Sequence, residues 1–264
     1  MSGVDLKGRV VIVTGGSQGL GASMARALAM AGGRVVIASP DRDKVEAVAA
    51  EIGKENALGV VADITKREDC ARIVDSALSA FGDVAVLINN ARLNMPEHHD
   101  ETFWEADIDF WDSAVRVNVF GTYLITRTVV PHLINKGWGR IVNITTSLST
   151  IQRARNSPYG VTKAAIEAQT IIWSKELEAK GVTVNSLIPG GACDTRVRTR
   201  APSGGKPLLP VHVMDDAAIW LASDLSDGHT GGRYVGKDWD AKLPPTAAAA
   251  KAKEPSVFRA RTEA

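Results

Sequence analysis

The chain contains the stretch Arg9-Val10-Val11-Ile12-Val13-Thr14-Gly15-Gly16-Ser17-Gln18-Gly19-Leu20-Gly21. Its first six residues form a short β-branched run that is apolar on both faces, as a central parallel strand requires. A glycine-rich turn and an Ala/Met/Leu segment with helical character follow, ending near Ala31. The glycines permit close backbone approach, and a helix N-terminus favours a pyrophosphate. This order predicts a dinucleotide-binding unit, although its spacing is TGxxxGxG and not the GxGxxG of the standard fingerprint.

Strands and helices are predicted to alternate along most of the chain. Further strands are expected at 34–38, 57–61, 84–89, 140–145, 183–188 and 230–235. Helices are expected at 41–53, 66–81, 110–135, 159–179 and 211–223. This alternation predicts an α/β fold, a single Rossmann-type, doubly wound parallel sheet of about seven strands with helices on both faces. The domain would span residues 1–238, and residues 239–264, with Pro244-Pro245 and an alanine run, would form an extended or flexible tail.

The amino-acid composition indicates a globular protein and argues against several classes of partner and site. The 264 residues are 45% hydrophobic and 23% charged, which is typical of a globular protein. A net charge of +1 gives no reason to expect nucleic acid or a membrane as partner. Two cysteines, Cys70 and Cys193, and the lack of an apolar leader or a transmembrane-length run favour a cytoplasmic protein. His98 and His99 are adjacent without an evident third ligand, so no metal site is expected.

The segment Tyr159-Gly160-Val161-Thr162-Lys163 places a tyrosine and a lysine on one face of a predicted helix. Pro158 precedes that helix, where its missing N–H does no harm. A nearby ammonium would favour the phenolate and lower the pKa of Tyr159 from about 10, which suits a general acid/base in hydride transfer. An isolated pair of this kind is usually an ordinary helix surface, so its meaning depends on the other motifs.

Those motifs together resemble the short-chain dehydrogenase/reductase family over about residues 6–235. They occur in the family's order, as Thr14-Gly15 to Gly21, Asp63, Asn89-Asn90-Ala91, Asn118, Tyr159 with Lys163, Pro189-Gly190, Leu221-Ala222-Ser223-Asp224 and Thr230-Gly231. The resemblance implies an NAD(P)-dependent oxidoreductase that interconverts a secondary alcohol and a ketone, with Tyr159 as general acid/base. Two alternatives stay open on the same fold, a non-catalytic dinucleotide-binding regulatory protein and a lyase or epimerase.

The resemblance also assigns cofactor contacts. Gly15, Gly19 and Gly21 would line the pyrophosphate, Asp63 and Ile64 would flank the adenine, and Asn90 would approach a ribose. Pro189 and Gly190 would lie against the nicotinamide, and Lys163 would hold its ribose. Asn118 would help to hold a water in the proton relay, or would merely satisfy a helix kink. The full predicted cofactor set is Gly15, Ser17, Gln18, Gly19, Leu20, Gly21, Ser39, Arg42, Asp63, Ile64, Asn90, Ala91, Tyr159, Lys163, Pro189 and Gly190.

The sequence departs from the family pattern at the catalytic hydroxyl. The family commonly has a serine thirteen residues before the tyrosine, and that position is Thr146 here. Ser147 follows immediately and would serve if the loop to Tyr159 were one residue shorter. The role needs only a hydroxyl that can hydrogen-bond the substrate oxygen, so the register favours Thr146 and Ser147 stays a close alternative.

A second departure is Arg92, where the family usually has glycine after Asn-Asn-Ala. The segments 92–104, 148–158 and 191–213 should form the mouth of the substrate site, with Trp104 near the substrate. Six arginines occur there, namely Arg92, Arg153, Arg155, Arg196, Arg198 and Arg200. They indicate either a solvated loop surface or a basic rim that recruits an anionic carbonyl or alcohol substrate.

In this family, the residue at the end of the second strand indicates whether the cofactor is NAD or NADP. An acidic residue there would accept the ribose hydroxyls of NAD and repel a 2′-phosphate. Ser39 with nearby Arg42 mildly favours NADP, whereas Pro40 and Gln18 stand where NADP-binding members often have basic residues. NAD therefore remains an alternative. The apolar helices at 111–133 and 159–179 also predict a homodimer or homotetramer, as in the family.

Overall fold

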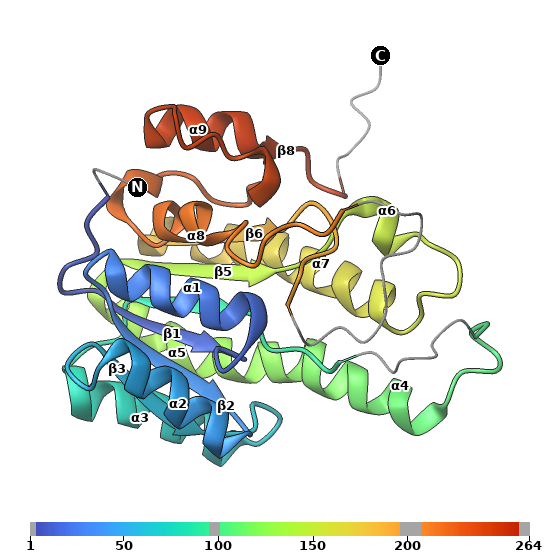
Figure 1. The fold of residues 1–264 in the computed structure, drawn as a ribbon, viewed down its shortest axis with the longest axis horizontal. Helices are drawn as coiled ribbons and strands as arrows, with labels where there is room; N and C mark the ends of the chain where they lie inside the picture. The colour runs from blue at the N-terminus through green and yellow to red at the C-terminus, as the bar shows by residue number, and fades with distance from the viewer. Residues whose placement is uncertain (1–3, 95–100, 196–206, 259–264) are drawn as a thin grey trace.

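The computed structural model describes residues 4–94, 101–195 and 207–258. Its centre is one eight-stranded sheet in the order β3-β2-β1-β4-β5-β6-β7-β8 (Figure 1). The strands are β1 (Val10–Thr14), β2 (Arg34–Ser39), β3 (Ala57–Val61), β4 (Val86–Asn89), β5 (Gly139–Ile144), β6 (Val182–Ile188), β7 (Arg233–Val235) and β8 (Lys253–Glu254). All neighbouring pairs are parallel except β7 and β8. The predicted Rossmann-type α/β fold is confirmed.

Helices cover both faces of the sheet. They are α1 (Gly19–Met30), α2 (Arg42–Ile52), α3 (Arg67–Phe81), α4 (Ile108–Val115), α5 (Thr122–Lys136), α6 (Leu148–Ile151), α7 (Tyr159–Leu177), α8 (Asp215–Leu221) and α9 (Pro245–Ala252). Residues of α1, α2, α8 and α9 pack in one core, and residues of α3, α5 and α7 pack in the other. Successive residues of β1 alternate between these cores, since Val11 belongs to the first and Ile12 to the second. A strand buried on both faces explains the uninterrupted apolar run in the sequence.

Two segments differ from the sequence-based expectation. Within residues 239–264, which were expected to be extended or flexible, the structure forms α9 and β8. Pro245 occupies the first turn of α9, where a proline is tolerated, and the alanines of this helix include three buried residues, Ala248, Ala249 and Ala252. Small side chains let the helix pack closely on the core. β8 is the strand that brings the sheet from the expected seven strands to eight.

The long helix expected at 110–135 is interrupted. A π-helical segment, η1 (Arg116–Gly121), lies between α4 and α5, and Asn118 is buried within it. The Thr122 hydroxyl donates a 2.8 Å hydrogen bond to the Asn118 carbonyl, which caps one of the groups displaced from the regular ladder. Segments of this kind often accompany functional sites. No helix in the described ranges is both long and apolar enough to cross a membrane.

Strand register brings polar residues together at the carboxyl edge of the sheet. Thr14 pairs with Asn89 across β1 and β4, and Asn89 pairs with Asn143 across β4 and β5. The Asn89 amide donates a 2.8 Å hydrogen bond to the Asn143 side chain, which fixes this row. The loops that follow these strands therefore begin side by side, where ligands bind in open α/β sheets.

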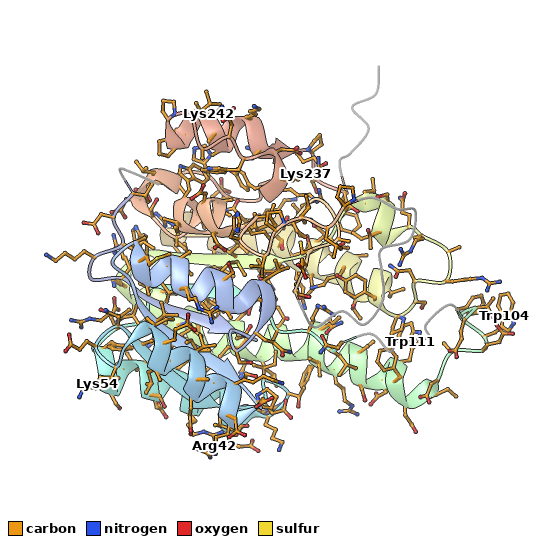
Figure 2. The ribbon with its side chains drawn as sticks, in the orientation of Figure 1. Arg42, Lys54, Trp104, Trp111, Lys237 and Lys242 are labelled. Carbon is orange, nitrogen blue, oxygen red and sulfur yellow. The ribbon has the colours of Figure 1, made fainter. Side chains whose placement is uncertain are left out.

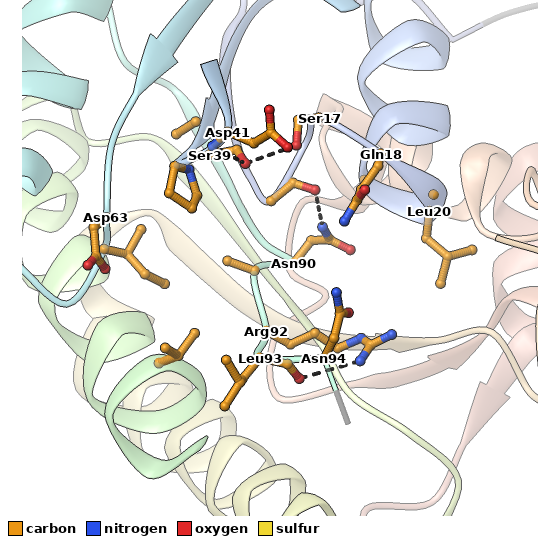
Figure 3. Close-up of a pocket in the computed structure, with 18 of the residues that line it drawn as sticks. Ser17, Gln18, Leu20, Ser39, Asp41, Asp63, Asn90, Arg92, Leu93 and Asn94 are labelled. Atoms are coloured by element: carbon orange, nitrogen blue, oxygen red, sulfur yellow. Dashed lines mark hydrogen bonds between the residues drawn. The ribbon is translucent and has the colours of Figure 1, made fainter. Parts of the chain in front are cut away.

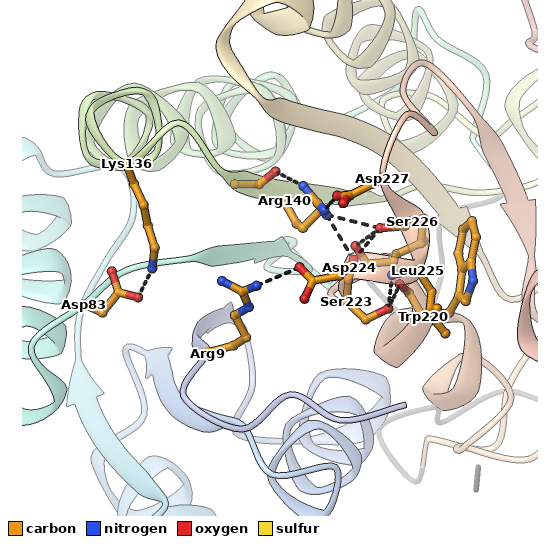
Figure 4. A network of polar contacts seen from close by, with 12 residues as sticks. Arg9, Asp83, Lys136, Arg140, Trp220, Ser223, Asp224, Leu225, Ser226 and Asp227 are labelled. Carbon is orange, nitrogen blue, oxygen red and sulfur yellow. Dashed lines mark hydrogen bonds and ion pairs between the residues drawn. The ribbon is translucent and has the colours of Figure 1, made fainter. Parts of the chain in front are cut away.

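The opposite end of β5 carries a charged cluster with a structural role (Figure 4). Arg140, 1% exposed, pairs with Asp227 and donates 3.2 Å hydrogen bonds to the Ser223 carbonyl and the Ser226 hydroxyl. Its guanidinium also lies 4.0 Å from the centroid of the Trp138 ring. These contacts fasten the start of β5 to the turn after α8 and leave the carboxyl edge as the candidate functional end.

Candidate active site

A cavity of about 440 Å³ opens at the carboxyl edge of the sheet (Figure 3). It is lined by the loops after β1, β2, β3 and β4, by the π-helical segment and by the loop after β6. The lining residues are Gly15, Ser17, Gln18, Gly19, Leu20, Gly21, Ala38, Ser39, Pro40, Asp41, Ala62, Asp63, Ile64, Asn90, Ala91, Arg92, Leu93, Asn94, Val117 and Thr195. Eleven of the predicted cofactor residues are among them, from Gly15 through Ala91, whereas Arg42, Pro189, Gly190, Tyr159 and Lys163 are not.

The glycine-rich loop owes its shape to close backbone packing. A Cβ on Gly21 would lie 2.3 Å from the Gly15 carbonyl oxygen, so no larger residue fits. The Asn90 side-chain amide donates to the carbonyls of Thr14 and Gly15, at 3.0 and 2.9 Å. The Thr14 hydroxyl accepts from the backbone N–H groups of Asn90 and Ala91, each at 3.1 Å. The loops after β1 and β4 thus form one rigid cradle.

The first turn of α1 faces this cradle without a competing anion. Its N-cap residue, Gln18, makes no side-chain capping hydrogen bond, and its first turn contains no acidic residue. Free backbone N–H groups and the positive end of the helix dipole are therefore available to an anionic group. This arrangement suits a pyrophosphate.

The far end of the cavity lies beside β2 and β3. The Ser17 hydroxyl donates a 2.9 Å hydrogen bond to the Ser39 hydroxyl. Asp41 accepts from the backbone N–H of Lys44 at 3.2 Å and pairs with its ammonium at 2.6 Å, and the side-chain hydrogen bond from Lys44 holds the Asp41 pKa below its usual value. Arg42 instead pairs with Glu46 at 3.0 Å on the outer margin of the molecule (Figure 2). The negative Asp41, and not the positive Arg42, lines this end.

Asp63 lines the cavity and also organises its own turn. Its carboxylate accepts hydrogen bonds from the Thr65 backbone N–H at 2.9 Å and from the Thr65 hydroxyl at 2.8 Å. Its backbone N–H donates to Asp69 at 2.8 Å. These bonds fix the turn after β3, so that the Asp63–Ile64 segment has a defined position at the cavity wall.

Lys163 is 4% exposed and donates a 2.7 Å hydrogen bond to the Ile144 carbonyl at the end of β5. Its pKa is lowered to about 7, chiefly by burial and also by the positive charge of Arg92, while the negative charge of Glu167 opposes both effects. Its Nζ atom lies 5.9 Å from the centroid of the Tyr159 ring. The predicted pair is therefore together in space as well as in sequence.

Tyr159 begins α7 and is half-buried. Within the part of the chain that the structure describes, its hydroxyl has no hydrogen-bond partner. Gly160 brings α7 against α6, since a Cβ there would lie 2.4 Å from the Ile151 carbonyl oxygen. This contact holds the loop after β5 close to the start of α7.

The two candidate hydroxyls of that loop have different surroundings. Ser147 is the N-cap of α6, where its Oγ atom accepts from the Thr150 backbone N–H at 3.3 Å. The same oxygen shares hydrogen bonds with the Ser149 and Thr150 hydroxyls, at 3.1 and 2.8 Å. Thr146 has only its carbonyl engaged, by Arg233 at 2.6 Å. Among the described residues its hydroxyl has no partner, so it is the freer of the two.

Asn118 links the cavity wall to α7. Its side-chain oxygen accepts a 2.7 Å hydrogen bond from the backbone N–H of Leu93, a lining residue. Its side-chain amide donates to the Thr162 hydroxyl at 3.1 Å, beside Lys163. The side chain thus uses both its oxygen and its nitrogen to fasten the η1 segment between the β4 loop and α7.

Thr195 is a lining residue that the sequence analysis did not identify. Its hydroxyl oxygen is buried and lacks a hydrogen-bond partner within the described ranges, and its Cβ atom would lie 3.2 Å from a Cβ on Gly19. A buried hydroxyl without a partner calls for an explanation, and a bound ligand would provide one. The position of Thr195 in the loop after Pro189-Gly190 is the feature of the sequence that could have indicated a role in the site.

The predicted basic mouth is only partly described. Arg92 is exposed, lines the cavity with Leu93 and Asn94, and makes a single long contact of 3.5 Å with the Leu93 carbonyl. Arg153 donates to Asn156 at 2.8 Å. Three further arginines and the histidine pair lie outside the described residues, namely Arg196, Arg198, Arg200, His98 and His99.

Trp104 does not lie where the sequence analysis expected it. It is 71% exposed and is not among the residues that line the cavity. Figure 2 shows it at the far edge of the molecule, beyond α4, and its ring meets Phe103 edge-on with centroids 5.0 Å apart.

Comparisons with known proteins agree with this geometry. A family model described as short chain dehydrogenase matches residues 9–204. The dehydrogenase LinX of Sphingobium indicum, named for 2,5-dichloro-2,5-cyclohexadiene-1,4-diol, is 31% identical over 239 residues, covering 86% of this chain and 93% of that protein. L-fucose dehydrogenase of Bos taurus is 32% identical over 188 residues, covering 71% and 67% of the two chains. A crystal structure of 3-ketoacyl-(acyl-carrier-protein) reductase from Brucella melitensis, complexed with NADH, has a TM-score of 0.78 at 33% identity, covering 87% of this chain and 96% of that chain.

Proposed function

The chain belongs to the short-chain dehydrogenase family of oxidoreductases, and we propose that it uses a nicotinamide dinucleotide to interconvert a secondary alcohol and a ketone. The observation that carries this proposal is the continuity of the site. Asn118 connects Leu93 of the cavity to Thr162, next to Lys163, while the Tyr159 hydroxyl has no partner among the described residues. The Thr162 hydroxyl in turn donates a 2.9 Å hydrogen bond to the Tyr159 carbonyl, so hydrogen bonds link the cavity wall to the backbone that carries the acid/base group.

The residues present fit a dinucleotide. The cradle around Gly15 and Gly21 and the N-terminus of α1, where Gln18 makes no side-chain cap, would hold a pyrophosphate. Asp63 and Ile64 would flank the adenine, and Asn90 would approach a ribose. The orphaned Thr195 hydroxyl offers a hydrogen bond at the other end of the cavity. When bound, the nicotinamide supplies or accepts the hydride.

We propose NAD over NADP as the preferred cofactor. The sequence favoured NADP through Ser39 and Arg42, but Arg42 pairs with Glu46 and does not line the cavity. Asp41 does line it, and the hydrogen bond from Lys44 lowers its pKa, which favours the carboxylate form. A carboxylate at that end accepts ribose hydroxyls and repels a 2′-phosphate.

Residues of the chain itself would transfer the proton that accompanies hydride transfer. Tyr159 would donate a proton to the substrate oxygen during reduction, or accept one during oxidation. Thr146 would donate a hydrogen bond to the same oxygen and stabilise the alkoxide as it develops. Lys163, held by Ile144, would keep its ammonium beside Tyr159 and reach a cofactor ribose. Asn118 would preserve the helix geometry on which this arrangement depends.

Arg92 supports an anionic substrate. It is an exposed cation at the cavity, and among the residues that the structure describes no carboxylate pairs with it. Arginine recognises carboxylate and phosphate groups with two parallel hydrogen bonds. We therefore propose a ketone or alcohol that also carries such a group. Acetoacetate and its uncharged ethyl ester form a matched pair of probes, and the acid should show the larger kcat/KM.

The decisive test of turnover is NADH and NADPH absorbance with a panel that includes acetoacetate, ethyl acetoacetate and cyclohexanone. Tyr159→Phe should abolish turnover and leave NADH binding nearly intact, because it removes one hydroxyl and little packing. Lys163→Ala should impair both. A Tyr159→Phe variant with near-wild-type turnover would contradict the mechanism. Tight NADH binding without turnover of any probe would favour a regulatory dinucleotide-binding protein instead.

A further inference from the structure

Arg233 is a fully buried arginine whose three nitrogens contact three separate segments of the chain. It lies in β7 and is 2% exposed. Its Nε atom lies 3.1 Å from Glu167 Oε1 in α7, and its Nη2 atom donates a 2.6 Å hydrogen bond to the Thr146 carbonyl. Its Nη1 atom pairs with Glu254 in β8. One guanidinium therefore joins the catalytic helix, the loop of the proposed catalytic hydroxyl and the C-terminal segment.

Glu167 makes this junction rigid. It is 1% exposed and lies one helical turn after Lys163. Besides Arg233, it accepts hydrogen bonds from the Thr145 hydroxyl and, at 3.2 Å, from the Ser186 hydroxyl. A buried carboxylate is tolerated only when such bonds replace its lost hydration. Its partners on β6 and on the end of β5 therefore have little freedom to move.

Glu254 is held in place by the sheet. β8 pairs antiparallel with β7, and the register sets Glu254 directly opposite Arg233. The preceding helix α9 anchors this strand through its buried alanines. Glu254 is 47% exposed and lies beyond residues 9–204, the region that the family model matches. The C-terminal segment thus reaches, through one residue, a group that holds the Thr146 carbonyl.

We propose that Arg233 is a positioning residue for Thr146, and that Glu254 orients its guanidinium, so that activity depends on the C-terminal segment. The role of Thr146 in this proposal rests on the proposed function, whereas the contacts of Arg233 are independent of it. The Thr146 backbone lies between a fixed Thr145 and the capping residue Ser147. A guanidinium that holds its carbonyl decides the direction in which the Thr146 side chain leaves the loop.

The first experiment needs no substrate. Hydrogen–deuterium exchange of the full chain would be compared for wild type, Glu254→Ala, Glu254→Gln and Asp240→Ala. Glu254→Ala leaves Arg233 paired with Glu167, so it creates no isolated buried charge. Asp240→Ala is the matched control, because Asp240 pairs with Lys251 of the same segment at 2.9 Å and does not touch Arg233. Exchange in residues 145–152 should accelerate in Glu254→Ala and not in Asp240→Ala, with Glu254→Gln in between. Unchanged exchange in Glu254→Ala would overturn the proposal.

The second experiment is a double-mutant cycle in kcat with Thr146→Ala, using the most active probe of the panel. Glu254→Ala should lower kcat about tenfold, as small misplacements of catalytic groups do, with the NADH Kd unchanged. In the Thr146→Ala background the same change should have almost no further effect, because coupled residues are not additive. Additive losses would overturn the proposal while leaving the proposed function intact. If Thr146→Ala alone costs nothing, the assigned hydroxyl is wrong, and the exchange experiment still decides whether Arg233 orders the loop.

Discussion

The Lys163 ammonium donates a 2.7 Å hydrogen bond to the Ile144 carbonyl, so the catalytic helix α7 is fastened to the last residue of β5. Thr145 and Thr146 follow immediately, and the loop therefore starts from a position that Lys163 itself fixes. The hydrogen bond holds the buried Lys163 within the electrostatic influence of Arg92, an exposed cation at the cavity. Because both groups are positive, the charge of one alters the ionisation of the other.

Arg92→Gln should raise the pKa of Lys163. Burial and the Arg92 charge hold the Lys163 pKa at about 7, against an ordinary value of 10.5, and removing that charge favours the ammonium. Between about pH 7 and pH 10.5, Lys163 is protonated in the unfolded chain and largely deprotonated in the folded chain. The unfolded chain therefore binds one more proton, and this lysine makes the free energy of unfolding rise with pH over that range. In Arg92→Gln the rise should begin at a higher pH, which urea unfolding at a series of pH values measures. The pH–kcat/KM profile should show its lysine limb displaced in the same direction.

Arg116→Gln is the control for that experiment. Arg116 is an exposed arginine that pairs with Asp112 at 2.6 Å, and its charge does not contribute to the Lys163 shift. An equal displacement in both variants would show that the effect comes from net charge and not from Arg92.

Thr146→Ala and Ser147→Ala should separate catalysis from stability. The Thr146 hydroxyl has no partner in the described part of the chain, so its loss should reduce kcat by about a hundredfold, as the loss of an oxyanion donor does. Ser147 caps the short helix α6, and its loss should cost about 1 kcal/mol of the free energy of unfolding with a smaller effect on kcat. Steady-state kinetics and urea unfolding of both variants measure this. The reverse pattern would assign the catalytic hydroxyl to Ser147.

Pro40→Arg should shift cofactor preference towards NADP. Wild type is expected to prefer NAD, because Asp41 lines the cavity and Arg42 does not. An arginine at position 40 would offer a charge-assisted hydrogen bond to a 2′-phosphate, worth about tenfold or more in kcat/KM for NADPH. The comparison is the ratio of kcat/KM for NADH and NADPH in the two proteins. A wild-type preference for NADPH would contradict the assignment of Asp41.

The parts of the site that sequence could predict are those set by local chemistry. The β-branched run before Gly15 and the glycines themselves specify a strand and a tight turn, and parallel topology then brings the strand ends together. The register before Tyr159 favours Thr146 over Ser147, but the local sequence does not show that Ser147 caps a helix of four residues. Arg233 gave no local signal either. Its partners come from α7, the β5 loop and β8, and only the folded chain brings them together.

The two helices expected to form subunit contacts carry both buried and exposed apolar residues. Leu124, Ile125, Val129 and Ile166 are buried against the sheet, as one face of a crossover helix must be. Phe120, Tyr123 and Ile172 remain 41%, 40% and 53% exposed, and the first two rings lie 6.2 Å apart. Exposed apolar residues on both helices agree with the expected subunit interface.

We therefore expect a homodimer or homotetramer, formed about two-fold axes that pair these helices. Light scattering at micromolar concentration should give at least twice the chain mass of 28.1 kDa. Ile172→Glu should dissociate the assembly, because a carboxylate would be buried without a partner. It should lower activity too, since α7 carries Tyr159 and Lys163. Met30→Glu is the control, because Met30 is 83% exposed on α1, which packs in the other core. A wild-type mass of one chain, or dissociation by Met30→Glu and not by Ile172→Glu, would contradict this interface.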